Sequence, residues 1–440
     1  MRISRIVLFT VVCGALVTAG CGTNIFRPAT ETAVAMSAVP AVRLNYRYES
    51  DVPAPAADAS GPFVEERNAS VQADFDATRT QELLDRTITS PDKKRVLAVY
   101  RNVLDQMSES RLDMYSPDGK LLRKITPESM AVHFPDTIVW SPDSASIAFV
   151  AMVRATGPLP LNPEAAPTAL STAEPPVGTN SNAADAKTGP EATPVQPAPA
   201  TPTPASASGV LTFRTEQIYI CNADGAGLKA LTQNEGLIYF YYVWSPDSSM
   251  LAALAATKRD WRYLEIVSDG KGEMLVPQGR LRVIEKNGRE RRLDDNLTAV
   301  RPVWSPDSAK IAVSFDTQIR LYDAAGISPT QSAIPLRNQL LLSSQAYDKE
   351  QARVGQAANT GADANSPAPA PVTPEPPQTT LPDEKLLVSY NPIVEIVWPA
   401  DDMLYLKTAY LRRMKNEADS VTSFSRWHRL ILTPQRAAVR

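Results

Sequence analysis

The sequence has little of the chemistry that disulfide-bonded scaffolds and metal sites require. Its 440 residues include 3 Cys and 2 His. Cys13 and Cys21 lie in an N-terminal targeting segment, which leaves Cys221 alone within an apolar run. One cysteine cannot form an internal disulfide, and the chain holds no Cys pair with metal-ligand spacing. The sequence therefore predicts neither a disulfide framework nor a cysteine-ligated metal.

An excess of charge of one sign is also missing. Lys and Arg number 45 against 48 Asp and Glu, giving a formal net charge of −3 with the two signs interspersed. Nucleic-acid binding needs a basic face, so we predict no nucleic-acid partner.

Catalytic motifs are equally sparse. Neither His133 nor His428 lies beside a nucleophile motif, and the Gly-x-Ser-x-Gly elbow is missing. Residues 225–230 match the dinucleotide fingerprint formally, but they lie between two strand-like runs and not before a helix, so they predict a hairpin turn. We predict no catalytic residue, no cofactor and no metal ligand. Paired carboxylates for sugar cleavage stay open, because their pairing is spatial.

Long apolar runs are limited to the N-terminus. Arg2 and Arg5 precede the apolar residues 6–17, a run too short to span a bilayer, and small residues follow at 18–20. Residues 1–20 are therefore predicted to be a signal peptide. The ending Thr-Ala-Gly-Cys resembles the bacterial lipoprotein box, which implies lipid attachment at Cys21. The alternative is an ordinary secretory signal cut near Gly20.

The residues after the cysteine suggest where the chain would be anchored. Gly22, and not Asp, follows Cys21, which by the same resemblance favours the outer membrane of a two-membrane bacterium. Residues 21–40 are small and polar, and we predict a tether. The expected location is the bacterial cell envelope, outside the cytoplasm, with the membrane reached through the N-terminal lipid.

What the sequence does contain is one repeated phrase. Trp-Ser-Pro-Asp, preceded by Val and followed by an apolar run, occurs three times, with a weaker copy at Ser90-Pro91-Asp92 and a degenerate one at Trp398. Pro and Asp suit the two central positions of a type I turn, and a tryptophan before the turn suits packing between sheets. The predicted structural anchors of the repeat are Trp140, Pro142, Asp143, Trp244, Pro246, Asp247, Trp304, Pro306, Asp307 and Trp398.

A second phrase accompanies the first. Residues 218–232 read IYICNADGAGLKALT, two strand-like runs around an Asp-Gly turn, and they precede the run that ends in Trp244. The two phrases resemble the TolB-type β-propeller repeat. The resemblance implies an all-β fold of four-stranded antiparallel blades. Five blades are visible in the sequence. Six are favoured by the resemblance, the sixth combining residues 41–48 with C-terminal strands.

The predicted propeller spans residues 41–440 and is interrupted twice. Residues 154–209 and 355–382 are rich in Pro and Ala and hold no aromatic residue, so we expect them to be disordered insertions. Residues 262–276 are predicted to form a hairpin around Asp269-Gly270, residues 281–293 another around Asn287-Gly288, and residues 337–353 a helix.

The repeat departs from its family at one position. Family turns continue Ser-Pro-Asp-Gly, whereas Ser144, Ser248 and Ser308 replace that glycine here. If the position has a positive φ, serine carries strain that glycine avoids.

These observations favour a non-catalytic module that binds an envelope protein or peptide through its loops or central funnel. Two alternatives stay open. One is a carbohydrate-active propeller enzyme that uses carboxylates, and the other is a structural envelope scaffold whose proline-rich insertions act as spacers.

Overall fold

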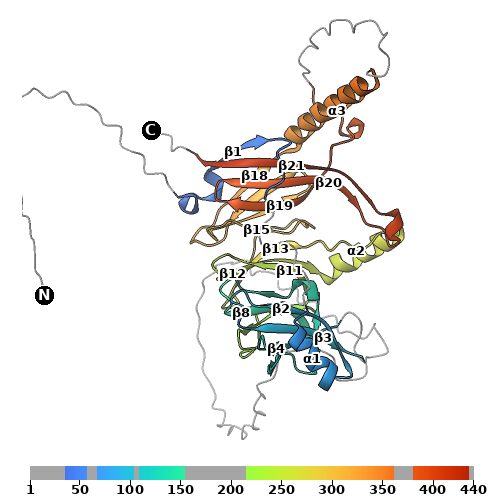
Figure 1. The fold of residues 1–440 in the computed structure, drawn as a ribbon. Helices are drawn as coiled ribbons and strands as arrows, with labels where there is room; N and C mark the ends of the chain where they lie inside the picture. Colours follow the sequence, from blue (N-terminus) through green and yellow to red (C-terminus); the bar gives the residue numbers. More distant parts are fainter. Residues whose placement is uncertain (1–34, 57–66, 104–108, 154–214, 361–379, 436–440) are drawn as a thin grey trace, which may run out of the picture. The chain divides into compact units, whose positions relative to one another are not determined.

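Five antiparallel sheets make up the computed structural model, which describes residues 35–56, 67–103, 109–153, 215–360 and 380–435 (Figure 1). The first sheet contains β2 (Glu82–Thr89), β3 (Val96–Asn102), β4 (Arg111–Tyr115) and β5 (Leu121–Lys124). The second contains β6 (Met130–His133) and β7 (Val139–Trp140), which share one position, then β8 (Ser146–Val153), β9 (Gln217–Asn222) and β10 (Lys229–Ala230).

The remaining three sheets repeat this order. The third contains β11 (Leu237–Trp244), β12 (Met250–Thr257), β13 (Arg280–Glu285) and β14 (Glu290–Arg292). The fourth contains β15 (Val303–Trp304), β16 (Lys310–Phe315), β17 (Gln318–Asp323) and β18 (Gln331–Pro335). The fifth contains β19 (Ile393–Ala400), β20 (Met403–Arg412), β21 (Val421–Pro434) and β1 (Leu44–Glu49). The prediction of four-stranded antiparallel blades is confirmed.

The second strand of the third sheet, β12, is apolar from Met250 to Ala256 because both faces of this sheet are covered. In β12, Leu251, Ala253 and Ala255 belong to the buried cluster shared with the second sheet. Ala252, Leu254 and Ala256 point to the opposite face and belong to the cluster shared with the fourth. Successive side chains of a strand face opposite sides, so an unbroken apolar run serves two neighbouring sheets at once.

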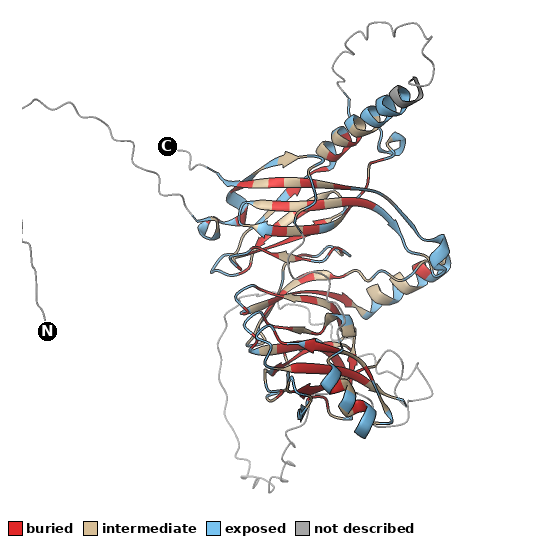
Figure 2. Ribbon diagram, in the orientation of Figure 1, coloured by how far each residue is buried: buried red, intermediate tan, exposed pale blue. Residues whose placement is uncertain are grey.

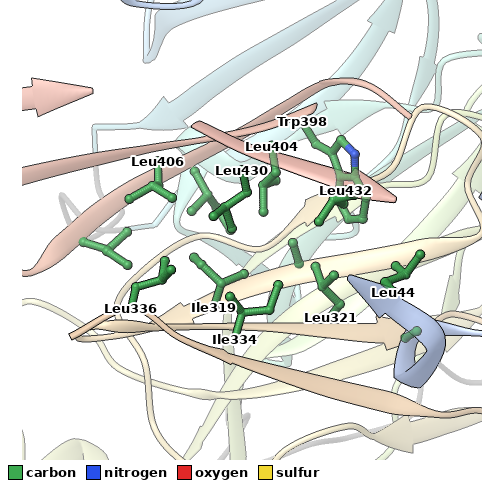
Figure 3. Packing of buried hydrophobic residues seen from close by; sticks show 14 of the residues in the cluster. Leu44, Ile319, Leu321, Ile334, Leu336, Trp398, Leu404, Leu406, Leu430 and Leu432 are labelled. Atoms are coloured by element: carbon green, nitrogen blue, oxygen red, sulfur yellow. The ribbon is translucent and has the colours of Figure 1, made fainter. Parts of the chain in front are cut away.

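Buried clusters join each sheet to the next. Between the fourth and fifth sheets, Ile319, Leu321 and Ile334 face Leu404 and Leu430 (Figure 3). The outward face of the first sheet packs instead on Val71 and Phe75 of α1 (Ala69–Thr78). This helix covers apolar surface that would otherwise face water.

The N-terminal strand closes the last sheet. β1 pairs antiparallel with β21, from Leu44 opposite Pro434 to Glu49 opposite Arg429. The predicted pairing of residues near 41–48 with C-terminal strands is therefore confirmed. The sheet that it completes is the fifth, and the described residues form no sixth sheet, so the favoured count of six is not met there.

Each sheet has two dissimilar ends. In an antiparallel meander, the connection from the first to the second strand and that from the third to the fourth lie at the same end of the sheet. We call this the turn end, because the Ser-Pro-Asp and Asp-Gly turns lie there. The second-to-third connections and the links between sheets lie at the other, the loop end. The added elements leave the loop ends: α2 (Lys258–Lys271) follows β12, and α3 (Arg337–Thr360) follows β18.

The hairpin predicted at residues 262–276 is wrong. Thr257 caps α2, its hydroxyl accepting a hydrogen bond from the Asp260 backbone N–H at 3.1 Å while the Asp260 carboxylate accepts from the Thr257 backbone. Gly272, with φ of 66°, ends the helix. This reciprocal capping box satisfies the first free backbone donors of the helix and outweighs the turn preference of Asp269-Gly270.

Other predictions fare differently. The hairpin around Asn287-Gly288 is confirmed as β13 and β14, and the helix at 337–353 is confirmed but continues to Thr360. Residues 355–360 therefore belong to α3 and not to the second insertion. Residues 1–34, the insertion at 154–209 and residues 361–379 lie outside the described residues. No helix in the described part of the chain is long and apolar enough to cross a membrane.

Candidate functional site

The four repeat tryptophans lie at turn ends, between sheets. Each is close to fully buried, at 5%, 5%, 6% and 7% exposed for Trp140, Trp244, Trp304 and Trp398. The indole N–H of Trp140 donates to the Ile88 carbonyl of the first sheet at 3.2 Å, and that of Trp304 donates to the Val243 carbonyl of the third at 3.1 Å. These side chains pack one sheet on the next and present no surface to a ligand.

The Ser-Pro-Asp turns satisfy their own polar groups. The Ser245 hydroxyl donates to the Asp247 carboxylate at 2.5 Å and accepts the Met250 backbone N–H at 3.0 Å. Ser141 and Ser305 bond in the same way to Asp143 and Asp307 and to the strand that follows. Partial burial raises the pKa of Asp247, but the bonds from Ser245 and Ser249 outweigh it and hold this pKa below its usual range. Pro142, Pro246 and Pro306 are exposed at the tips of these turns.

The serines that replace glycine link successive turns. Ser144, Ser248 and Ser308 have φ of 59°, 61° and 61°, so the condition under which serine carries backbone strain holds at all three turns. Their hydroxyls accept backbone N–H groups from the preceding sheet, with N–O distances of 3.0, 3.0 and 2.9 Å from Asp92, Asp143 and Asp247 in turn. Glycine could not form this bond, which offsets the cost of the left-handed conformation.

The residues most often used in catalysis are engaged within the fold. His428 is fully buried between the hydroxyls of Tyr48 and Thr408, at 2.9 and 3.1 Å from its two ring nitrogens. Burial lowers the pKa of His428 to about 4. Burial likewise raises the pKa of the Cys221 thiol to about 12, which makes it a poor nucleophile. In the described ranges, no three His, Cys, Asp or Glu side chains are grouped so that they could hold a metal ion.

The glycine-rich motif at residues 225–230 lies in a hairpin. Gly225 and Gly227 have φ of 76° and 67° in the connection between β9 and β10. The Asp224 carboxylate accepts the Ala226 backbone N–H at 3.0 Å, as in a simple Asx turn. The predicted turn is confirmed.

The loop ends differ, because large apolar side chains are exposed there. Among the described residues with exposed large apolar side chains, all but Val42, Leu121, Leu122 and Ile327 lie in or beside loop-end connections. On α2, Tyr263 and Ile266 are 66% and 58% exposed. These two side chains lie three residues apart, on one face of the helix.

A projecting hairpin reaches α2 from the fifth sheet. β20 and β21 extend beyond Ile393, the first residue of β19. Their connection (residues 413–420) meets the C-terminal end of α2 (Figure 1). The Met274 backbone N–H donates to the Arg413 carbonyl at 2.9 Å, and Lys415 N–H donates to the Gly272 carbonyl at 3.0 Å. Elements of the third and fifth sheets are thereby joined directly.

Ion pairs reinforce this junction. Arg412 Nε lies 3.1 Å from Glu273 Oε1, and Lys415 Nζ lies 2.8 Å from Asp269 Oδ1. The hydrogen bond from Lys415 and its charge lower the pKa of Asp269. These groups are largely exposed, so the pairs fix geometry more than they add stability.

We call the exposed side chains of α2, of the segment after it and of the projecting hairpin the brace surface. Figure 2 shows the projecting hairpin as exposed, in contrast to the buried strands behind it. The apolar members of the brace surface are Tyr263, Ile266, Met274, Val276, Tyr410, Leu411, Val421 and Phe424.

Sequence reasoning missed the brace surface because it assigned residues 262–276 to a hairpin. Thr257 and Asp260 have the spacing of a capping box, and this signal could have revealed the helix. The projecting hairpin could not be found this way, because its contact with α2 joins segments far apart in the chain.

The repeated meanders, packed face to face with tryptophan anchors between them, define the class: this is a repeat protein of the β-propeller type. The chain is distantly similar in structure to TolB-like and prolyl-oligopeptidase propeller domains. No protein-family model matches the sequence, and no curated protein matches it.

Three solved structures illustrate the similarity. A candidate TolB from Agrobacterium tumefaciens is 14% identical with a TM-score of 0.26, over 58% of this chain and 63% of that one. An oligogalacturonate lyase from Vibrio parahaemolyticus is 9% identical with a TM-score of 0.29, over 57% and 54%. Prolyl oligopeptidase B from Galerina marginata, bound to a 35mer substrate, is 12% identical with a TM-score of 0.32, over 60% and 31%. The matched part is under two thirds of each of these proteins, and no activity follows for this chain.

Proposed function

We propose that this chain is a lipid-anchored, extracytoplasmic β-propeller that acts as a non-catalytic protein-binding module of the bacterial cell envelope. In this proposal the lipid is attached at Cys21 and the partner protein docks on the brace surface. The observation that carries the proposal is the gathering of exposed Tyr, Ile, Leu, Phe and Met side chains on α2 and the projecting hairpin.

The composition of the brace surface supports a protein partner. Aromatic residues, Met and Arg are enriched in protein interfaces, and large exposed apolar patches mark interaction sites. Tyr263 and Ile266 are accompanied on α2 by the exposed Arg259 and Arg262. The turn ends contrast with this, since their serines, aspartates and tryptophans are used within the fold.

The position of the N-terminal segment supports the same arrangement. Lys310, the first residue of β16, follows a Ser-Pro-Asp turn, and its Nζ donates to the Met36 carbonyl at 3.0 Å. The segment that leads back to Cys21 therefore starts from a turn end. Fully extended, residues 21–36 span at most about 55 Å. A chain tethered from its turn ends leaves its loop ends free for a partner.

Photo-cross-linking at two matched isoleucines tests this function. Ile266 on the brace surface and Ile327 in a turn-end connection are 58% and 104% exposed. A photoreactive phenylalanine analogue placed at position 266 should cross-link one protein in intact envelopes, whereas the analogue at position 327 should not. Equal cross-linking at both positions, or at neither, would contradict the proposal.

A further inference from the structure

Four acidic side chains of α2 and of the segment after it are paired with basic side chains of the same chain. Glu265 pairs with Arg262 at 3.0 Å, and Asp260 pairs with Arg280. Asp269 pairs with Lys415 and Glu273 pairs with Arg412, both on the projecting hairpin. Four carboxylates that could attract a basic partner are thus engaged.

Three basic side chains on the same elements differ from the paired groups just described. Arg259 and Lys271 on α2 and Arg413 on the projecting hairpin are exposed. None of the three forms an ion pair within 4.0 Å in the described part of the chain. Glu417 and Asp419 at the far tip of the hairpin are the opposing exposed charges, and Asp419 keeps its charge while its carboxylate accepts a hydrogen bond from the Asn416 amide at 3.0 Å.

Unpaired cations beside apolar side chains favour the binding of a negatively charged partner to the brace surface. The whole chain carries a formal net charge of −3, so a locally positive surface is not a general property of the molecule. Complementary potentials across an interface speed encounter and exclude partners of the wrong sign. Arg259 lies one helical turn before Tyr263, so an acidic group could meet the guanidinium while its apolar neighbours cover the ring.

Building on the proposed function, we infer that the brace surface recognises an acidic, apolar segment of a partner protein. Its apolar side chains cover Tyr263, Ile266 and the exposed hairpin residues, and its carboxylates pair with Arg259, Lys271 and Arg413. Surface charges are screened by salt, so recognition weakens as ionic strength rises.

An anionic membrane offers similar chemistry, and the tether position argues against it. The N-terminal segment is held at a turn end by Lys310, whereas the brace surface lies at loop ends. Met36, held by Lys310, therefore lies at the opposite end of the sheets from the brace surface. We therefore commit to a protein segment, and vesicles form one arm of the test.

The test uses three defined probes and the full-length protein. The first is a labelled amphipathic peptide of Leu and Glu, the second its Leu and Lys counterpart, and the third vesicles of phosphatidylcholine and phosphatidylserine. The variant Arg259→Glu/Arg413→Glu reverses charge on the brace surface. Lys94→Glu/Lys120→Glu makes the same change in charge at the turn ends of the first sheet, where both lysines are exposed.

The acidic peptide should bind the native protein, and its affinity should fall on the order of tenfold in the brace variant but not in the control. The basic peptide and the vesicles should not bind. Equal binding of both peptides, no binding of the acidic one, an unchanged affinity in the brace variant, or vesicle binding would each overturn the inference. Cross-linking at position 266 would still be observed if only this charge preference were wrong, so the two failures are distinguishable.

Discussion

The two ends of the sheets carry different residue types and use them for different purposes. At the turn ends, serine, aspartate and tryptophan repeat at fixed positions. The serine and aspartate side chains bond within the turn or to the neighbouring sheet, and the indoles of Trp140 and Trp304 donate to the preceding sheet. At the loop ends, the connections differ from sheet to sheet and expose tyrosine, isoleucine and phenylalanine. Repetition therefore marks the part that holds the sheets together, and irregularity marks the part available to a partner.

The largest contrast is expected when one aromatic side chain is removed from each end. Trp304→Ala should destabilise the protein by about 3–5 kcal/mol, because it opens a cavity between the third and fourth sheets. Tyr263→Ala removes an exposed ring and should change stability by no more than about 0.5 kcal/mol. Urea unfolding of both variants measures the difference. Comparable losses would show that the ends are not specialised as described.

The next largest effect is on the pH dependence of the free energy of unfolding, which should differ between groups near the loop ends and groups at the turn ends. His428, near the loop end of the fifth sheet, is neutral in the fold because its pKa is lowered from 6.5 to about 4. The contribution of neutral His428 to the free energy of unfolding is fully present above pH 6.5. As the pH falls from 6.5 to 4, the unfolded chain takes up a proton that the folded chain does not, at a cost of up to about 3 kcal/mol. This loss should be missing in His428→Gln.

Groups at the turn ends should affect the free energy of unfolding at lower pH values than His428 does. The pKa values of Asp143 and Asp247 lie below 3.8, because hydrogen bonds from Ser141 and Ser245 outweigh the effect of partial burial. Their stabilising contribution is present above pH 3.8 and is lost as the pH falls through the lowered values. Unfolding free energies measured at a series of pH values should therefore fall in two steps. A single step shared by native protein and His428→Gln would contradict this separation.

A smaller effect tests the serine links. Ser248→Ala keeps a side chain at φ of 61° and removes the acceptor of the Asp143 N–H, so it should cost about 1–2 kcal/mol. Ser248→Gly loses the same bond but relieves the left-handed strain of roughly 1 kcal/mol, so it should be nearly neutral. Thermal and urea unfolding rank the two variants. A harmless Ser248→Ala would mean that the hydroxyl link contributes nothing.

The smallest change in stability is expected at the brace. Asp269→Asn with Glu273→Gln removes two exposed ion pairs and should leave the free energy of unfolding almost unchanged, because solvent screens such pairs. Release of the hairpin should nevertheless speed hydrogen exchange at residues 410–424, because local opening needs less free energy than global unfolding. Unchanged exchange there, with exchange at the turn ends as reference, would show that the backbone bonds alone hold the hairpin.

The sequence predicts the turn ends well and the loop ends poorly, for a physical reason. Trp244, Ser245 and Asp247 interact mainly within a few residues or with an identical neighbour, so their roles follow from the repeated phrase. The brace surface depends on contacts such as that between Glu273, in the segment after α2, and Arg412 at the end of β20, which lie far apart in the chain. No local signal encodes such a contact. The five blades visible in the sequence correspond to the five sheets of the described residues. A sixth sheet is not found among them, because β1, expected to help build it, pairs with β21 and completes the fifth.

The central claim is tested most directly by comparing Ile266→Ser with Ile327→Ser in binding to the protein cross-linked through position 266. Both changes replace an exposed isoleucine, one at a loop end and one at a turn end. Ile266→Ser should weaken the equilibrium affinity roughly tenfold, the effect of losing about 1.4 kcal/mol of interface contact, while Ile327→Ser should leave it unchanged. Equal affinities for the two variants, or a loss confined to Ile327→Ser, would contradict the assignment of binding to the loop ends.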